Sequence, residues 1–264
     1  MNKYEIGFKA RTWFMAAVLA AFMAGCGGDE IFGTTGGGAG TGGGPGAGTC
    51  AAGNLPLGSA ASFGVLAGTA LTITNPTSVT GNVGSPSITP AAGPSTLVGT
   101  MYDSSPASEL TVISTAVSDM QTGIACALAR PCDFNYAAAT DFGGMALAPG
   151  VHCVAAAMSV GSNLTLSTPG VYIFRSTGAL TSAATVTVAF GGAANASNSS
   201  VFWVSTGAAS NVSIGATNVF LGTIMVGNLG DPGAATVGAN TTLLPGRVLS
   251  TNAVTLDTNT IAIP

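Results

Sequence analysis

The chain has few side chains that could perform acid–base, nucleophilic or metal chemistry. His152 is its single histidine, and ten acidic residues are scattered over 264 positions. Catalysis needs titratable groups that converge on one site, and a zinc site needs several His or Cys ligands at close spacing. His152 stands in a short apolar run, which favours a structural role, and no G-x-S-x-G nucleophile motif occurs. We therefore predict no enzyme activity, no cofactor and no metal.

The aspartates do not suggest a site either. Asp141, Asp231 and Asp257 stand singly near residues typical of turns. This placement is typical of turn capping and not of paired carboxylates or a calcium loop. Polysaccharide lyases built on β-helices would need clustered Asp, Lys and Arg, and the sequence contains no such cluster.

Four cysteines follow Cys26, namely Cys50, Cys126, Cys132 and Cys153. An even number in an exported chain predicts two disulfides, for which three pairings are possible. We favour Cys126 with Cys132, across the end of a predicted helix, and this leaves Cys50 with Cys153. The lack of a CxxC pair argues against zinc.

Composition excludes several classes of partner. Charged residues make up 6% of the chain and apolar residues 47%. From Cys26 onward, three arginines stand against nine acidic residues, a net charge of −6. Such a chain has no basic surface for nucleic acid or anionic lipid. After the N-terminus no run approaches the ~20 apolar residues of a membrane span, so we expect a folded monomer that meets a membrane only through a lipid anchor.

The N-terminus carries the pattern of an export signal. Lys3, Lys9 and Arg11 precede an apolar segment, which ends in small residues directly before Cys26. That ending resembles a bacterial lipobox. We predict that residues 1–25 are a signal peptide and that Cys26 becomes a lipidated N-terminus at the outer membrane or cell surface, since Gly27 and not Asp follows it. The alternative is an ordinary secreted protein, released from the cell, in which Cys26 is a spare thiol.

A flexible tether is predicted over residues 26–53. Residues 33–48 are Gly, Thr, Ala and one Pro, a composition that cannot bury a core. The folded domain is expected over residues 54–264.

A short apolar pattern recurs five times within the folded domain. Its copies start at Val151, Val171, Val201, Thr223 and Arg247, which are 20, 30, 22 and 24 residues apart. A period in this range, with strand-type residues and no helical pattern, indicates stacked repeats that bury their apolar edges against each other. Two shorter strands follow in each unit. The prediction is an all-β dominated, irregular three-sided β-solenoid, with small uncharged side chains outside.

The region before the repeats adds further elements. Residues 63–83 predict one more solenoid turn, and residues 84–104, with many prolines nearby, predict an irregular loop. Residues 105–129 predict one long α-helix along one side of the solenoid, ending before Pro131, with Ser104 or Ser105 as its cap and Pro106 in its first turn. Its apolar residues fall at helical spacing: Leu110, Ile113, Val117, Ile124 and Leu128.

Several short motifs occur in a characteristic order along residues 55–263. They are Leu57–Gly68, Thr80–Gly84, Leu147–Val151, Val201–Val204, Gly246–Leu249 and Ala253–Ile261. In this order they resemble the ice-binding-like family of microbial antifreeze proteins, formerly a domain of unknown function. The resemblance implies an irregular three-sided β-helix with a long helix along one side. It also implies that the N-terminal turn closes against the C-terminal repeats, and that a flat face adsorbs to ice.

The resemblance supplies no ice-binding residues, because the family has no regular Thr-x-Thr array, although Thr69–Thr72 resembles a T-A-x-T pattern of some members. We place the site on the second strand of each unit, where alternation points hydroxyls outward and alanines flank them. Uncharged hydroxyl and methyl groups could order water into a lattice-like layer, whereas a charged group would keep its own hydration shell. The candidate ice-binding residues are Thr72, Ser159, Thr181, Ser213, Thr236 and Thr255.

Two other interpretations remain open. Thr and Ser are also good exterior strand residues without any function. The chain could instead be an adhesin or structural module that binds polysaccharide or another cell. Such a site would show exposed aromatics and carboxylates, whereas here the aromatics Phe174, Phe202, Trp203 and Phe220 stand in runs that look buried.

Overall fold

The computed structural model describes residues 50, 52–90, 93–208, 210–228 and 230–264, all within one compact unit, Gly44–Pro264. The predicted signal peptide, Cys26 and most of the tether lie outside the described residues. The helices are η1 (Gly58–Ser62) and α1 (Ala107–Ala129). The strands are β1 (Phe63–Ala67), β2 (Leu71–Ile73), β3 (Ser78–Thr80), β4 (Asn82–Gly84), β5 (Ile88–Thr89), β6 (Thr96–Val98), β7 (Met101–Tyr102), β8 (Phe134–Tyr136), β9 (Thr140–Asp141), β10 (Gly150–Val154), β11 (Met158–Val160), β12 (Leu164–Leu166), β13 (Gly170–Ser176), β14 (Leu180–Ser182), β15 (Val188–Phe190), β16 (Ser199–Ser205), β17 (Val212–Ile214), β18 (Val219–Val226), β19 (Ala235–Val237), β20 (Thr242–Ser250), β21 (Val254–Leu256) and β22 (Thr260–Ala262).

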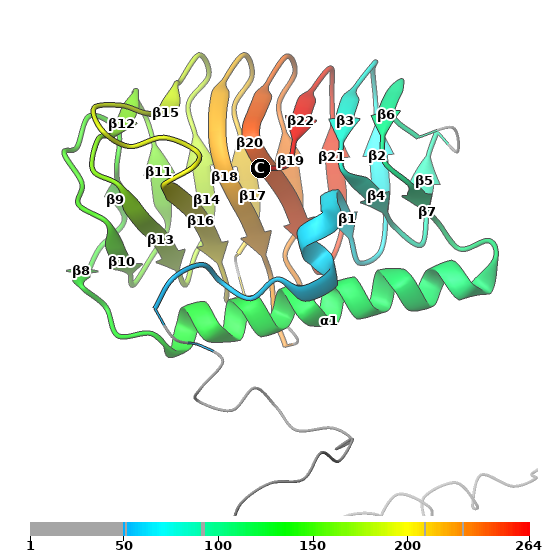
Figure 1. Cartoon of the computed structure of the whole chain (residues 1–264), viewed down its shortest axis with the longest axis horizontal. Coiled ribbons are helices and arrows are strands. Elements are labelled where there is room, and N and C mark those ends of the chain that lie inside the picture. The colour runs from blue at the N-terminus through cyan, green and yellow to red at the C-terminus, as the bar shows by residue number, and fades with distance from the viewer. Residues whose placement is uncertain (1–49, 51, 91–92, 209, 229) are drawn as a thin grey trace, which may run out of the picture. The chain divides into compact units, whose positions relative to one another are not determined.

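Parallel strands build a three-sided solenoid, as the repeat pattern predicts (Figure 1). The first face carries the five apolar runs in β10, β13, β16, β18 and β20, and α1 lies along it. The second face is one eight-stranded sheet in the order β5-β2-β21-β19-β17-β14-β11-β9. On the third face β12 pairs only with β15, and a single bridge between Thr187 and Val219 joins this pair to the beginning of β18.

The order of the coils in space differs from their order in the chain. The N-terminal turn stacks on the C-terminal coil, because β1 pairs with β20, β2 with β21 and β3 with β22. The chain then advances through β4–β7 to one end of the solenoid, and α1 returns it to the other end, where β8 begins (Figure 1). The closure implied by the family resemblance is therefore confirmed.

The length of α1 matches the length of the solenoid that it spans. On the helix-covered face, β7 and β8 are separated by eight strand-to-strand steps, or about 38 Å at ~4.8 Å per step. The 23 residues of α1 extend about 35 Å at ~1.5 Å per residue. The number of coils thus determines how long the connecting helix has to be.

The two sides of the helix-covered face are both buried, which explains why its strands are continuously apolar. One set of side chains fills the solenoid interior, and the other packs under α1 against Ile113, Met120 and Ile124. By length and hydropathy alone α1 could cross a membrane, but its apolar stripe is used for this packing. The strands of the eight-stranded sheet alternate instead, with a buried, exposed, buried pattern in β2, β17 and β19, which start at Leu71, Val212 and Ala235.

Three local predictions were wrong. Residues 84–104 are not an irregular loop, because β5 and β6, with β4 before them and β7 after, add a further coil of very short strands. The helix begins at Ala107, two residues late, with Pro106 and not a serine at its N-cap. The alternation of Thr185–Val188 predicts a strand with Thr185 pointing outward, but Thr185 turns a corner with φ of 60° and β15 begins only at Val188.

Both predicted disulfide pairings were also wrong, although two disulfides do form. Cys50 pairs with Cys126, and Cys132 pairs with Cys153. Cys126 lies on the buried side of α1, which faces the segment that follows Cys50. After α1 the chain turns at Arg130, and Cys132, just before β8, reaches Cys153 in β10, the strand with which β8 pairs.

Arg175 contacts both the C-terminal end of α1 and the Cys132–Cys153 disulfide. Its Nη1 donates to the carbonyls of Ala127 and Leu128 in the last turn of α1, at 2.6 and 2.5 Å. Its Nε and Nη2 lie 2.9 Å from the sulfurs of Cys153 and Cys132. A cation at this end of a helix also complements the helix dipole, so Arg175 fixes where the returning helix docks.

His152 is a structural residue, as its place in an apolar strand suggests. It is 1% exposed and stacks between Phe134 and Phe174, with ring centroids 4.5 and 4.9 Å away. Its Nε2 lies 3.0 Å from the carbonyl of Ala148, so Nε2 donates and Nδ1 accepts from Tyr136 Oη at 3.1 Å. Burial lowers the pKa of His152, against smaller raising effects of the Ala148 hydrogen bond and the Asp133 charge.

This lowered pKa predicts a pH-dependent stability. The unfolded imidazole titrates near pH 6.5, so the stabilisation is complete above about pH 6.5 and is lost as the pH falls toward the lower folded pKa. We expect the free energy of unfolding to fall by up to about 1.4 kcal/mol per pH unit in that window. His152→Phe keeps a stacked ring and should flatten the dependence. Urea unfolding at pH values from about 7.5 to 5.5 tests this, and equal slopes in both proteins would contradict it.

Candidate functional site

One row of small hydroxyl side chains runs across the eight-stranded sheet. All six residues singled out in the sequence fall into it, in the order Ser159, Thr181, Ser213, Thr236, Thr255 and Thr72. Each is the register partner of the next, so the row follows the strand-to-strand direction without a slip. We refer to these six residues, with Thr89, as the hydroxyl ladder.

Thr89 extends the ladder by one strand, because it is the register partner of Thr72. The sequence analysis missed it, since β5 lies in the stretch predicted as a loop. A signal was present: Ile88-Thr89 repeats the apolar–Thr step of Leu71-Thr72. The seven rungs extend over about 29 Å at ~4.8 Å per strand step.

The ladder faces solvent, and its hydroxyls have no partners among the described residues. Ser159 and Thr255 are partly exposed and the other five are exposed. Hydroxyls at the corners of the solenoid behave differently: those of Ser176, Ser250 and Thr241 each donate to a backbone carbonyl, at 2.6–2.8 Å. The ladder hydroxyls therefore remain available for hydrogen bonds with water outside the protein.

A second row, mostly of alanines, runs beside the ladder. The residue after each member donates a backbone hydrogen bond to the carbonyl of the next member, as from Met158 N to Ala179 O, Leu180 N to Asn211 O and Val254 N to Ala70 O. The sequence predicts alanines beside the hydroxyls, and Ala157, Ala179 and Ala253 do lie in this row. Asn211, Ala234, Ala70 and Ser87 complete it. The surface thus combines methyl groups and hydroxyls in two parallel rows.

Charge is almost absent from this surface. Asp141 occupies the end strand opposite Ser159, and its Oδ1 accepts from the backbone N–H groups of Gly143 and Gly161. Asp257 stands at a corner and accepts from Asn75 Nδ2 and Thr258 Oγ1. Both carboxylates are thus engaged in turns, as the sequence predicts, and the central strands carry no ionisable side chain.

The other two faces differ from this one. The first is covered by α1. On the third, the sheet is interrupted between β15 and β18, and bulky apolar side chains stand outward, with Val98 62%, Val219 46% and Leu244 45% exposed. Among the faces that the described residues form, the eight-stranded sheet alone is both continuous and lined with small groups.

Neither the hydroxyl ladder nor the row beside it contains an ionisable side chain, as the described residues show. Within the described parts of the chain, no group of three or more His, Cys, Asp and Glu could hold a metal ion. What the geometry provides is a regular, rigid pattern of uncharged donors, acceptors and methyl groups. Such a surface can recognise a flat, ordered partner. It is too flat to enclose a small molecule.

Comparisons with known proteins agree on one family. A family model described as ice-binding-like matches residues 65–262. An ice-binding protein of Flavobacterium frigoris (strain PS1) is 33% identical over 224 residues, which cover 79% of this chain and 76% of that protein. An ice-binding protein of Colwellia sp is 31% identical over 224 residues, which cover 80% and 84%.

Solved structures show the same architecture. An ice binding protein from an Antarctic biological consortium has a TM-score of 0.65 at 28% identity, covering 79% of this chain and 91% of that chain. The ice-binding domain of a Shewanella frigidimarina protein has a TM-score of 0.67 at 24% identity, covering 81% and 99%, and supports the fold.

Proposed function

The chain belongs to the ice-binding-like family, and we propose that it binds ice through the hydroxyl ladder and the alanine row beside it. Adsorption there would produce thermal hysteresis and inhibit ice recrystallisation. The observation that carries this proposal is the uninterrupted register of seven small hydroxyl side chains on seven neighbouring strands of the eight-stranded sheet. The proposed activity is adsorption by a monomer and requires no catalytic group.

The physical argument rests on hydration. A charged side chain binds its own water shell strongly and would disrupt an ice-like arrangement, whereas hydroxyls can hydrogen-bond ordered water at little cost. Parallel strands fix the rungs at ~4.8 Å intervals, and the packed solenoid core holds the sheet rigid. Water molecules bound along the ladder would therefore share one regular spacing, which is the condition for joining a growing crystal.

Binding of polysaccharide is the competing hypothesis. Such sites typically present aromatic platforms and carboxylates, but Phe174, Trp203 and Phe220 are fully buried and Phe202 is 4% exposed. Their rings stack inside the solenoid or pack under α1. Neither the comparisons nor the surface favours this function.

Microscopy of a single ice crystal in a solution of the purified protein tests the proposal. The expected result is a faceted crystal that does not grow over a measurable interval below the melting point. A crystal that grows as a smooth disc, as it does in buffer, would reject ice binding by this protein.

We further propose that the protein is exported and held at the cell surface by lipid on Cys26, with residues 26–53 as a tether between the lipid and the domain at residues 54–264. This part of the proposal rests on the sequence, because residues 1–49 lie outside the described structure. The small residues before Cys26 support lipidation of that cysteine, and the glycine-rich segment after it supports a flexible linker between the lipid and the domain.

Cys26→Ala tests the anchor. The variant should remain unprocessed or appear in the soluble fraction, whereas the native protein should sediment with membranes and take up a lipid label. A native protein without label, fractionating like the variant, would show that the chain is secreted without an anchor.

A further inference from the structure

Arg247 is a buried cation without a counter-ion. Its side chain is 8% exposed, and its pKa is lowered by burial. Its one hydrogen bond runs from Nη1 to Thr223 Oγ1 at 3.4 Å, and Nε has no partner. No carboxylate among the described residues pairs with it. Since a guanidinium offers five N–H donors and an unpaired buried charge is costly, this arrangement suggests that a ligand supplies the missing negative charge.

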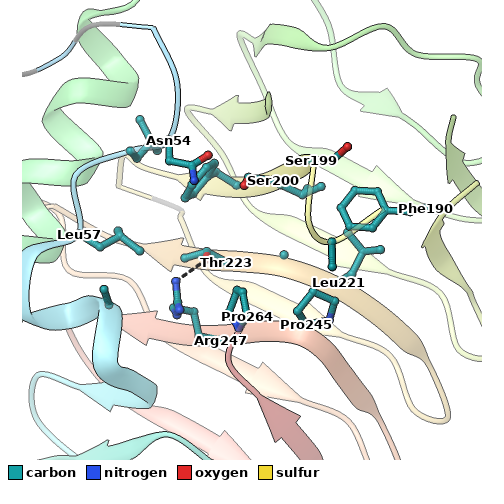
Figure 2. A pocket seen from close by; sticks show the side chains of 16 residues that line it. Asn54, Leu57, Phe190, Ser199, Ser200, Leu221, Thr223, Pro245, Arg247 and Pro264 are labelled. Carbon is teal, nitrogen blue, oxygen red and sulfur yellow. Dashed lines mark hydrogen bonds between the residues drawn. The ribbon is translucent and has the colours of Figure 1, made fainter. Parts of the chain in front are cut away.

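Arg247 lines a pocket whose volume is close to that of the smallest small-molecule sites. The pocket has a volume of about 280 Å³, near the lower end of the roughly 300–1,000 Å³ that such sites span. Figure 2 shows the Arg247 guanidinium pointing toward Thr223, with Leu57, Phe190 and Leu221 also in the lining. Polar groups come from Asn54 and Ser200. A few polar groups in an apolar enclosure are typical of a binding site.

The pocket faces away from the hydroxyl ladder. It is formed where β18 and β20 bend from the third face into the helix-covered face, together with the start of β16 and the segment before η1. In a three-sided coil, the corner between two faces lies opposite the remaining one, which here is the eight-stranded sheet. A molecule bound in the pocket would therefore not compete with ice for the same surface.

We propose that this pocket binds a small organic molecule through its carboxylate. One guanidinium neutralises one carboxylate and can hold it by two parallel hydrogen bonds. A doubly charged phosphate would leave an excess negative charge in the enclosure, which is costly. The apolar walls favour a ligand whose carboxylate is attached to a hydrophobic body, such as an aromatic organic acid, over an acidic sugar with a polyhydroxylated ring.

Benzoate and benzamide form a matched pair of probes, because they differ mainly in charge. Benzoate at tenfold excess over its Kd should raise the unfolding midpoint by about 3–6 °C, and benzamide should raise it far less. Sodium chloride at equal ionic strength controls for salt. Glucuronate carries the same charge on a polyhydroxylated ring, so it should shift the midpoint less than benzoate does. No shift with either acid, or equal shifts with benzoate and benzamide, would overturn the proposal.

Two variants connect the binding to this pocket. Arg247→Met keeps the length of the side chain and removes the charge, so it should abolish the benzoate shift without lowering the midpoint of the free protein. Ala196→Trp should block the pocket from an exposed position in its lining and also abolish the shift. Retention of the shift in Ala196→Trp, or in a folded Arg247→Met, would contradict the assignment. Ice shaping should be unchanged in both variants, because the ladder lies on the opposite side.

Discussion

Thr181→Lys should abolish thermal hysteresis and leave the fold intact. Thr181 is the second rung of the hydroxyl ladder, between Ser159 and Ser213. A lysine there would stand above the sheet and hold its own hydration shell, so the rungs on both sides could no longer contact one flat lattice. Because Thr181 is exposed and its hydroxyl has no partner among the described residues, stability should change by only about 0.5 kcal/mol. Hysteresis and urea unfolding measure the two effects separately.

The matched control is Thr260→Lys on the third face. Thr260 is an exposed strand residue, in register with Thr242 and Ser78, so it introduces the same charge in a similar strand environment. It should leave hysteresis unchanged. If Thr181→Lys retains hysteresis and Thr260→Lys loses it, the third face binds ice; if both retain it, neither row does.

Removal of the Cys50–Cys126 disulfide should cause the largest loss of stability. The two residues are 76 positions apart, and the loss of a crosslink that closes such a loop costs about 4 kcal/mol in the chain-entropy model. The Cys50→Ala/Cys126→Ala variant also frees the segment that leads into Leu55 and Leu57, which pack under α1. Urea unfolding can be followed through Trp203, which is fully buried and is the one tryptophan after the predicted signal peptide.

The second disulfide provides the comparison. Cys132 and Cys153 are 21 positions apart, so Cys132→Ala/Cys153→Ala should cost less, about 3 kcal/mol. Mass spectrometry of an unreduced digest identifies the pairs directly. A peptide that links Cys126 with Cys132 would contradict the structure, and so would a larger loss from the second variant than from the first.

The solenoid could be predicted from the repeated apolar runs of its longer strands, whereas its shortest strands could not be detected. Runs such as Val201–Val204 are continuously apolar because both sides of their strands are buried, under α1 and in the core. The eight-stranded sheet was recognisable from its alternation at Leu71–Ile73 and Val212–Ile214. Residues 84–104 escaped detection because β5 and β7 have two residues each, too few to show any period.

The disulfides and the pocket depend on information that spacing does not contain. The pairing of Cys126 is decided by which side of α1 faces the solenoid and by where the N-terminal segment crosses it. Arg247 stands in an apolar run in the sequence, and its missing counter-ion becomes visible only when β16, β18 and β20 are assembled. The hydroxyl ladder, by contrast, could be predicted from one position in the second strand of each repeat. For that reason six of its seven members could be named from the sequence.

The most direct test of ice binding by the eight-stranded sheet is adsorption itself. Each protein is produced without residues 1–26, fused at its N-terminus to a fluorescent protein, and exposed to a growing single ice crystal. Native protein and Thr260→Lys should coat the crystal and remain after exchange into label-free buffer, whereas Thr181→Lys should wash away. A crystal coated equally by Thr181→Lys would show that the hydroxyl ladder is not the ice-binding surface.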